Sequence, residues 1–321
     1  MLKYIIKLNE EDNMRIATRI NSFLKNNKSI SEVLEKIGSI NGITHVDLNY
    51  PEHLKGIELE NIKAVLHRKN LEVNGLALRF GKYFVNGELG NSDMSIVEKA
   101  KNLCKKAIDI TKELGGKQIT IWLEYDGFDY AFQLNYTKSW NQIVNAFREI
   151  ADYDSKIMVS IEYKPYQLRA YSLVPDIGTT LLLINEVDRE NLGVTLDFCH
   201  MLMKNENPAY SLCLAGERGK LFGIHLNDGH QLNDDGFMVG SVNFIQTLEF
   251  IYYMKKYNYE GVIYFDTFPV REDSTVECET NIRLLRRYLK LINLIGMDEI
   301  QNIINKNNAI AAQEIFFKCI K

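Results

Sequence analysis

The sequence predicts an α/β fold, a (β/α)8 TIM barrel with a C-terminal helical extension. Short apolar runs rich in β-branched residues alternate with longer stretches of helical periodicity along the 321-residue chain. Several runs are continuously apolar, as is typical of parallel strands covered on both faces. A doubly wound open sheet is the alternative, but its first strand usually precedes a glycine-rich turn, and here "LNEEDNM" follows. Eight strands are predicted, over 2–9, 43–49, 73–80, 118–124, 157–163, 193–198, 221–227 and 261–268.

Helix signals fill the gaps between these strands. Residues 29–40 begin with a serine cap, and residues 91–117 begin with cap candidates and end at two glycines. Residues 243–261 repeat the pattern before the eighth strand. Two further helical stretches follow, of which the first is long enough to complete a barrel. We therefore expect a catalytic barrel over 1–295 and a helical tail over 296–321 that packs either on another subunit or on its own barrel.

Composition excludes several classes of protein. The chain is 46% hydrophobic and 25% charged, which is typical of a globular protein with a large core. Its formal net charge of -4 offers no general basic field, so we expect no nucleic-acid partner. No apolar stretch approaches the ~20 residues needed to cross a membrane, and the N-terminus lacks a signal-peptide pattern. Five scattered cysteines without a CxxC pair indicate reduced thiols and a cytoplasmic location.

Ionisable residues end four successive strands in the second half of the predicted barrel. Strand five ends in Glu162, strand six in Asp197, strand seven in His225 and strand eight in Asp266. Chemistry in a (β/α)8 barrel is located at the carboxyl ends of the strands. Any one of these residues alone is more simply explained as a helix cap or a core histidine. Together they predict a divalent-cation site, because clustered carboxylates repel one another unless a cation joins them.

A second set of candidate ligands lies in the following loops. "DFCH" places His200 three residues after Asp197, and "HLNDGHQLNDDG" adds further acids, among them Asp234 and Asp235. Loop acids are commonly solvated, so this set is less specific than the first. If it holds an ion, two adjacent metals are available to bind vicinal sugar oxygens.

The motifs "VSIEYKP", "LDFCH", "HLNDG" with "NDDG", and "YFDTF" together resemble the xylose-isomerase-like barrel superfamily of sugar isomerases and epimerases. Their order on four successive strands is most similar to L-rhamnose isomerases and D-apiose isomerases. The resemblance implies a first, structural metal held by Glu162, Asp197, His225 and Asp266. It also implies a second, catalytic metal held by His200, Asp234 and Asp235.

The resemblance further implies an aldose–ketose isomerase acting on a free sugar. Mn²⁺ is the expected ion, with Co²⁺ or Mg²⁺ as alternatives and one or two ions per chain, and the expected assembly is a homodimer or homotetramer. Hydride shift and enediol transfer both remain open as routes between C1 and C2. The implied catalytic residues are Lys164, Glu162 and Asp266, and the implied substrate-binding residues are His200, Trp122, Asp126 and His53.

Two departures from the family pattern concern the identity of the sugar. An acid usually stands eight residues after the strand-seven histidine, and here that residue is Asn233. The histidine that opens the sugar ring in the family has no clear match here, and His53 is the expected substitute.

The main rival to the isomerase is a ketose 3-epimerase, which uses one metal and two opposed carboxylates. A dehydratase or lyase, an apurinic endonuclease and a non-catalytic sugar-binding barrel are weaker alternatives, since only six histidines are present and all four primary ligands are retained.

Overall fold

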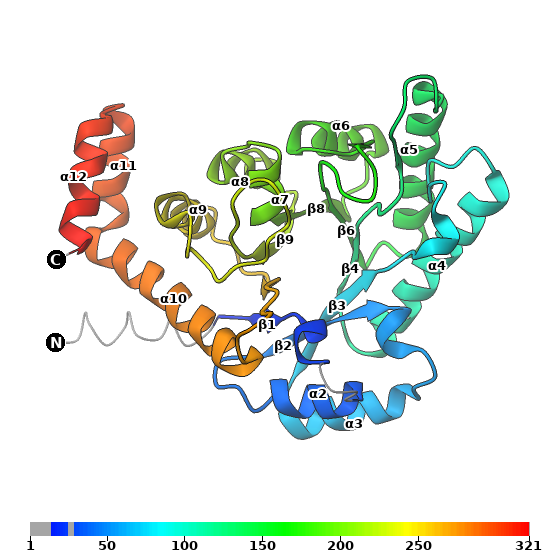
Figure 1. The fold of residues 1–321 in the computed structure, drawn as a ribbon, viewed down its shortest axis with the longest axis horizontal. Coiled ribbons are helices and arrows are strands. Elements are labelled where there is room, and N and C mark those ends of the chain that lie inside the picture. The colour runs from blue at the N-terminus through cyan, green and yellow to red at the C-terminus, as the bar shows by residue number, and fades with distance from the viewer. Residues whose placement is uncertain (1–13, 25–28, 321) are drawn as a thin grey trace.

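Eight parallel strands form one sheet that curls into a nearly closed barrel, as predicted (Figure 1). The computed structural model describes residues 14–24 and 29–320. The sheet order is β1-β10-β9-β8-β6-β4-β3-β2. Its two ends meet where the amide of Thr44, just before β2, donates to the carbonyl oxygen of Ile16 over 3.0 Å. The barrel strands are β1 (Ile16–Thr18), β2 (His45–Tyr50), β3 (Glu72–Leu78), β4 (Gln118–Ile121), β6 (Met158–Glu162), β8 (Leu192–Asp197), β9 (Leu221–Leu226) and β10 (Ile263–Phe265).

The first barrel strand lies at a different place from the one predicted. It was predicted over 2–9, and those residues lie outside the described part of the chain. The position between β10 and β2 is taken instead by β1, which pairs in parallel with β10. The three residues of β1 are all buried, but "IAT" is too short to stand out as an apolar run. Each of the other seven predicted strands overlaps a barrel strand.

Helices surround the barrel and begin at the predicted caps. Ser29 and Glu32 form a reciprocal capping box at the start of α2, and Asp93 accepts a hydrogen bond from the amide of Ser95 at the start of α4. After α4, Gly115 adopts a φ of 78°, a conformation that favours glycine. The helices of the barrel are α2 (Ile30–Ile37), α3 (Leu59–Lys69), α4 (Met94–Glu113), α5 (Tyr136–Tyr153), α6 (Ile177–Val187), α7 (Phe198–Met203), α8 (Pro208–Gly216), α9 (Phe244–Lys256) and α10 (Ser274–Ile295).

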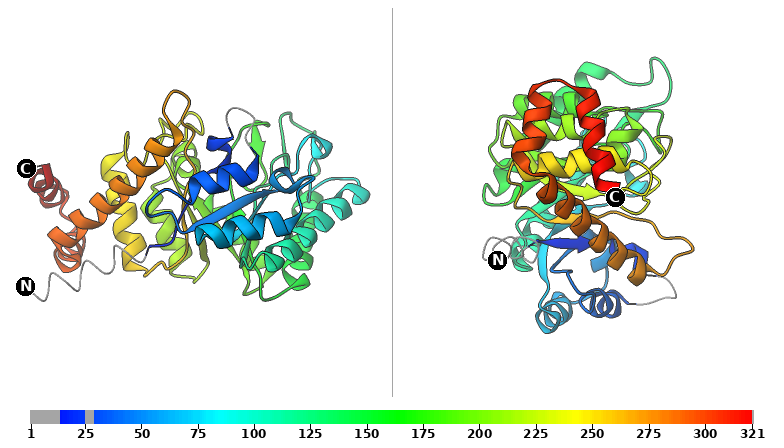
Figure 2. Two further views of the ribbon diagram at one scale, coloured as in Figure 1. Left: turned by 90° about the horizontal axis from the view of Figure 1, so that it is seen from below. Right: turned by 90° about the vertical axis from the view of Figure 1, so that its left-hand side faces the viewer.

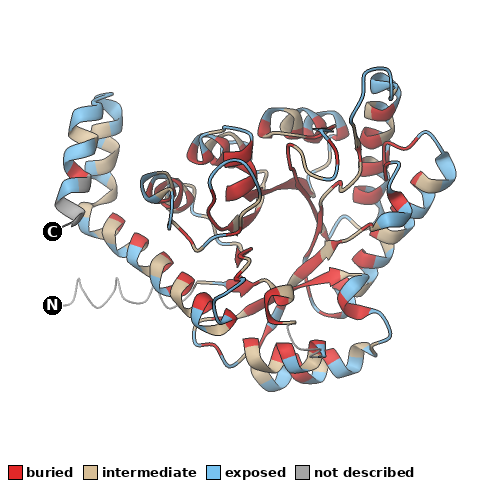
Figure 3. Ribbon diagram, in the orientation of Figure 1, coloured by how far each residue is buried: buried red, intermediate tan, exposed pale blue. Residues whose placement is uncertain are grey.

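Shorter elements occupy the loops, and the hydrophobic core lies between the strands and the helices. Figure 3 shows buried residues along the strands and on the helix faces turned toward them. Aromatic side chains such as Phe147, Phe198 and Phe250 are fully buried in this layer. No helix within the described ranges is long and apolar enough to cross a membrane. The short elements are η1 (Ile20–Phe23), η2 (Glu52–Leu54), η3 (Lys82–Phe84), β5 (Gly127–Phe128) and β7 (Tyr171–Ser172).

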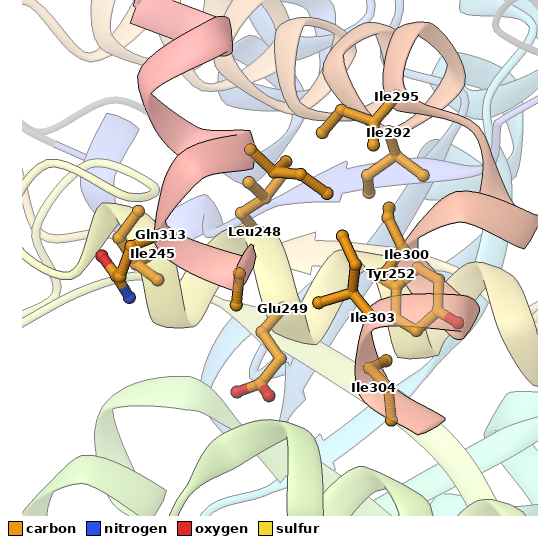
Figure 4. A pocket seen from close by; sticks show the side chains of 12 residues that line it. Ile245, Leu248, Glu249, Tyr252, Ile292, Ile295, Ile300, Ile303, Ile304 and Gln313 are labelled. Carbon is orange, nitrogen blue, oxygen red and sulfur yellow. The ribbon is translucent and has the colours of Figure 1, made fainter. Parts of the chain in front are cut away.

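Two helices, α11 (Met297–Asn305) and α12 (Ala309–Ile320), stand at the edge of the molecule beyond α9 and α10 (Figures 1 and 2). Helix α10 ends at Ile295, and Gly296 then turns the chain with a φ of 93°. This turn coincides with the predicted boundary between barrel and tail. An apolar groove of about 240 Å³ lies between the two helices and the α9–α10 face, and isoleucines from all four helices line it (Figure 4). The tail therefore contacts the barrel through a small, incompletely filled apolar seam.

Candidate metal centre at the mouth of the barrel

The four predicted primary ligands converge at the carboxyl end of the barrel. Ligand atoms of Glu162, Asp197, His225 and Asp266 all lie within 4.8 Å of one another. Glu162 is the last residue of β6, Asp197 the last of β8, His225 lies in β9, and Asp266 directly follows β10. All four are buried or nearly so. The arrangement has the size and the donor set of a site for one divalent cation.

Strand register explains why these side chains meet. Asp197 is the register partner of His225, and His225 is the partner of Tyr264, two residues before Asp266. Alternate residues of each strand face the barrel interior, so a shared register brings inward-facing side chains of neighbouring strands together. One layer below the ligands, the hydroxyls of Ser160 and Thr195 lie 2.6 Å apart. The residues two positions further on, Glu162 and Asp197, therefore point to the same interior.

A second group of candidate ligands shares one carboxylate with the first. Ligand atoms of Asp197, His200 and Asp234 also lie within 4.8 Å of one another. Asp197 caps α7 by accepting a hydrogen bond from the amide of His200 over 3.0 Å, which places the imidazole beside the first group. His200 Nδ1 lies 2.9 Å from the carbonyl oxygen of Tyr163, and Nε2 lies 3.3 Å from Asp234 Oδ2. Nδ1 therefore donates to that carbonyl oxygen, which leaves Nε2, beside Asp234, as the ring nitrogen that would coordinate an ion.

Asp235 is not part of either group, contrary to the predicted role as a ligand. Its Oδ2 accepts a hydrogen bond from the amide of His230 over 2.7 Å. The carboxylate thus closes the loop "GHQLNDD", while its neighbour Asp234 faces the metal groups. Consecutive residues of an extended loop point to opposite sides, so only one of the two adjacent acids reaches the interior.

The electrostatics of the cluster favour the binding of a cation. Burial, together with the neighbouring acids, raises the pKa of Asp197 to about 7, and burial also raises the pKa of Asp266. Burial opposes ionisation of Glu162 as well, but the adjacent His225 lowers its pKa to about 2 and in turn has its own pKa raised to about 9. Asp234 Oδ1 is buried without a hydrogen-bond partner. Three carboxylates and an orphaned oxygen in one pocket are the donor set that a divalent cation requires.

Two side chains outside the predicted set hold the ligands in place. The amide nitrogen of Asn227 donates to both carboxylate oxygens of Asp197, at 3.1 and 3.3 Å, and to the carbonyl oxygen of Asp266. Arg19 Nε lies 3.2 Å from Asp266 Oδ1 and its guanidinium lies over the ring of Phe268. Arg19 directly follows β1 on the inward-facing side. Sequence reasoning missed it because the first strand was expected over 2–9.

Lys164 and Trp122 lie together next to the second group. Lys164 Nζ is 2.8 Å from Asp234 Oδ2 and 5.1 Å from the centre of the Trp122 indole. Lys164 is two residues beyond Glu162 and so emerges on the same face of the strand path. Trp122 directly follows β4 and is half-buried. The two side chains thus form one wall of the mouth beside the candidate metal groups.

Asp126 and Arg169 connect two loops and do not face the mouth. Asp126 is 2% exposed, and its carboxylate accepts hydrogen bonds from the amides of residues 88–90 over 2.8–3.1 Å. Arg169 donates to the carbonyl oxygens of Leu123, Glu124 and Asp126. Both side chains are therefore engaged with backbone groups, which argues against the predicted sugar contact of Asp126.

His53 is likewise occupied by neighbouring protein groups. Its Nδ1 accepts a hydrogen bond from the amide of Asn49 over 2.9 Å, and its Nε2 contacts Asn21 Oδ1. The side chain is 3% exposed, and burial lowers its pKa to about 4. Neither ring nitrogen is free for a sugar hydroxyl, so the structure does not support the predicted role in substrate binding.

A family model described as the xylose isomerase-like TIM barrel matches residues 32–288, a range that includes both candidate metal groups. The chain belongs to the xylose isomerase-like TIM barrel family. This membership confirms the superfamily resemblance carried by the four strand-end motifs. The family match begins within α2, covers the seven barrel strands that follow β1, and ends within α10, before the two tail helices.

Relatives of this family member include isomerases and epimerases. The xylose isomerase of Thermus thermophilus is 24% identical over 196 residues, which are 59% of this chain and 51% of that protein. The L-ribulose 3-epimerase of a Methylomonas species is 25% identical over 182 residues, 56% of this chain and 60% of that protein. The chain thus spans only about half to three-fifths of these curated relatives. The crystal structure of a D-allulose 3-epimerase from Methylomonas, in complex with D-allulose, has a TM-score of 0.67 at 20% identity over 88% of this chain and 97% of that one, which shows a common fold.

Proposed function

We propose that the protein is a metal-dependent sugar isomerase that interconverts an aldose and a ketose by moving hydrogen between C1 and C2. The observation that carries this proposal is the second group, Asp197, His200 and Asp234, with Lys164 bonded to Asp234 beside it. A single-metal epimerase needs only the first group of four. The second group adds His200 and Asp234 as further candidate ligands, and Lys164 adds a positive charge beside them. In this proposal, C1 and C2 of the open-chain sugar lie next to these residues.

The residues fit divalent ions of hard character, and Mn²⁺ is the ion we propose, ahead of Co²⁺ and Mg²⁺. Glu162, Asp197, His225 and Asp266 would hold a first ion, and Asp197, His200 and Asp234 a second. When bound, such ions supply Lewis-acid stabilisation of negative charge that develops on the sugar oxygens. Asn227 orients the Asp197 carboxylate toward the ion sites, and Arg19 orients that of Asp266.

The protein's own side chains then position the sugar and move its protons. Lys164 donates hydrogen bonds and is held by Asp234, so a substrate hydroxyl or a water beside it meets an oriented ammonium group. Trp122 offers an apolar face against which the carbon chain packs. Asp266 faces the cluster, and burial raises its pKa, which favours a role in proton exchange.

A ketose 3-epimerase is the second candidate, favoured by the relatives named L-ribulose 3-epimerase and D-allulose 3-epimerase. In that reaction Glu162 and Asp266 would act as the opposed acid and base on either side of C3. One experiment separates the two reactions. Protein loaded with Mn²⁺ is incubated with a panel of aldoses and ketoses in D₂O, apiose and the 6-deoxy sugars included, and the products are followed by NMR.

An isomerase yields a ketose from an aldose, whereas an epimerase yields a C3 epimer from a ketose and forms no aldose. Bound Mn²⁺ per chain provides a second measurement, since the two groups predict two ions and a single-metal epimerase predicts one. The variant His200→Asn should lower the bound ion count by one if the second group holds an ion. Absence of any product from metal-loaded protein would contradict both candidates.

We also propose that the tail, 296–321, forms a contact between subunits of a homodimer or homotetramer in the cytoplasm. Helix α11 has no buried residue, and Ile310 and Phe317 of α12 are 75% and 68% exposed. Apolar side chains of this size on an outer hairpin suit an oligomer interface. Light scattering of the whole chain and of a chain ending at Ile295 tests this: an oligomer that persists without the tail contradicts it.

A further inference from the structure

We propose that Arg79 binds an anionic group of the substrate, so that the substrate is a sugar bearing a carboxylate or a phosphate at the end remote from the candidate metal groups. This substrate class rests on the proposed sugar-isomerase function and specifies it. Arg79 is a half-buried residue that directly follows β3 at the mouth of the barrel. Its position and the lack of a carboxylate or carbonyl partner for its guanidinium among the described residues support this role.

Strand register places Arg79 on the inward-facing side. Ala77 pairs with Asn49 on one side and with Thr120 on the other, and Trp122 follows Thr120 by two residues as Arg79 follows Ala77. Arg79 Cζ lies 5.8 Å from the centre of the Trp122 ring. Arg79 and Trp122 are thus neighbours in the layer that also contains the metal ligands.

The indole of Trp122 has two cations close to it. Lys164 Nζ lies 5.1 Å from the ring centre and Arg79 Cζ lies 5.8 Å from it. Lys164 comes from the strand that also supplies Glu162, whereas Arg79 comes from β3, on the far side of β4 in the sheet order. A sugar whose reacting carbons lie beside Lys164 and whose chain runs along Trp122 therefore presents its opposite end to Arg79.

Arg79 differs from the other cations near the mouth because, among the described residues, its guanidinium contacts the Trp122 ring but has no carboxylate or carbonyl partner. Arg19 pairs with Asp266 at 3.2 Å, Lys164 pairs with Asp234 at 2.8 Å, and Arg169 donates to backbone carbonyls. Within the described ranges, no carboxylate lies within 4.0 Å of the Arg79 guanidinium and no hydrogen-bond acceptor is in place for it. A half-buried guanidinium without a partner is a ready donor to a ligand oxyanion.

The direct ion pairs at the mouth leave the Arg79 guanidinium without a carboxylate of its own. The three carboxylates of the first group are neutralised by one divalent cation together with Arg19, and Asp234 is neutralised by Lys164. A second ion would only add positive charge. Arg79 acts on Glu162 only through space, where it helps to lower the pKa of that carboxyl, and no carboxylate pairs with its guanidinium directly.

The chemistry of arginine is consistent with an oxyanion as the ligand. Its planar guanidinium presents parallel N–H donors that match a carboxylate or a phosphate, and it stacks favourably against indole. A uronate supplies such a carboxylate and a sugar phosphate supplies such a phosphate. Both groups present oxyanion oxygens to Arg79, but they differ in size and in charge.

The test measures binding by calorimetry to Mn²⁺-loaded protein and uses matched pairs of probes. D-glucuronate is compared with D-glucose, and D-ribose 5-phosphate with D-ribose. We expect one charged probe to bind at least about tenfold more tightly than its neutral partner, and the preferred pair identifies carboxylate or phosphate as the group. Arg79→Gln should abolish this difference, and Arg79→Lys should restore part of it because it keeps the charge without the planar donors.

Arg218, exposed in the turn after α8 at the opposite end of the barrel, provides the control variant Arg218→Gln, which should bind every probe as the native protein does. Equal binding of charged and neutral probes by the native protein would overturn the role of Arg79, as would an equal loss for both in Arg79→Gln. The outcomes that contradict the proposed isomerase function differ from those that contradict the role of Arg79. Charged probes that bind through Arg79 without any C1–C2 exchange contradict the function alone, and turnover of neutral sugars alone contradicts the anionic substrate.

Discussion

Lys164 Nζ lies 2.8 Å from Asp234 Oδ2, across 70 residues of sequence and between two different strand-end loops. His200 Nε2 lies 3.3 Å from the same oxygen. One carboxylate oxygen thus faces an ammonium group and an imidazole, while the other oxygen, Oδ1, is buried without a partner. Burial disfavours the charged form of Asp234, but His200 and Lys164 outweigh it and lower its pKa. Asp234 therefore links the lysine to the candidate metal groups.

Replacing Lys164 by methionine should strongly reduce turnover and lower the free energy of unfolding. Methionine keeps the apolar contact with Trp122 but removes the ammonium group, so we expect kcat to fall about 100-fold or more. The buried Asp234 loses one partner, so the free energy of unfolding should fall by about 1–3 kcal/mol. Steady-state kinetics and urea unfolding measure the two effects.

Lys101 offers a matched control for this change. It is a buried lysine of α4 that pairs with Glu149 at 2.6 Å on the outer surface of the barrel. Lys101→Met should lower stability by at most about 1 kcal/mol, because its acidic partners are half-exposed, and should leave kcat unchanged. Unchanged turnover in Lys164→Met with a substrate that the native protein converts would remove Lys164 from the proposed mechanism.

Removal of divalent ions should lower both the melting temperature and the activity. Without an ion the buried acids of the first group repel one another, and an ion present at 100 times its Kd stabilises the folded chain by about 2.7 kcal/mol. Differential scanning calorimetry with EDTA and then with added Mn²⁺, Co²⁺ or Mg²⁺ should show a melting temperature that rises by several degrees. The variant Glu162→Gln, which removes a charge from the first group, should respond much less. A melting temperature that no ion changes would count against a metal centre here.

Replacing Asp126 by asparagine distinguishes a structural role from a sugar contact. The carboxylate accepts hydrogen bonds from the amides of residues 88–90, and asparagine has one acceptor oxygen instead of two. We expect the free energy of unfolding to fall by about 1–3 kcal/mol, with KM and the bound ion count unchanged. Asp129→Asn is the control, since Asp129 is exposed and accepts a hydrogen bond from the amide of Ala170. A raised KM at unchanged stability would support the sugar contact instead.

Stability should depend on pH through His53. Burial lowers the pKa of His53 to about 4 in the folded chain, from 6.5 for an ordinary histidine. Below pH 6.5 the unfolded chain takes up a proton that folded His53 does not accept until about pH 4. Its contribution to stability is therefore fully present above pH 6.5 and is lost as the pH falls toward 4.

The variant His53→Gln has no titrating group at this position and tests that dependence. It should be less stable than the native chain at pH 8, and the difference should shrink as the pH falls from 6.5 toward 4. Urea unfolding followed by circular dichroism over this range measures it. His67→Gln, at an exposed site on α3, serves as the control. A difference that stays constant across the range would show that titration of His53 does not contribute to folding.

The candidate metal centre was predictable because it depends on local sequence and on one general property of the fold. Polar residues that end apolar strands are visible in the sequence, and the carboxyl ends of parallel strands meet at one rim of a barrel. Glu162, Asp197, His225 and Asp266 were therefore identified before any distance was known, and the structure brings all four together. His200 and Asp234 were predicted instead from the loops that follow the sixth and seventh strands and from the family resemblance.

Hydrogen-bond partners from distant loops were not predictable. Asp126 and Asp235 are acids near the mouth by sequence, but the amides of residues 88–90 and of His230 determine where their carboxylates point. His53 is held by Asn49 and Asn21 in the same manner. The hydrophobic pattern of the sequence does not predict such contacts, because they depend on how the loops pack against each other.

The barrel, seven of its eight strands, and the three acids and one histidine at four strand ends follow from the sequence alone, because apolar periodicity and burial act locally along the chain. The start of β1 at Ile16, and with it the contact of Arg19 with Asp266, depends instead on the three-dimensional fold. A three-residue strand is specified by its neighbours in the sheet and not by its own composition. The unpaired charge of Arg79 likewise follows from which side chains surround it in space.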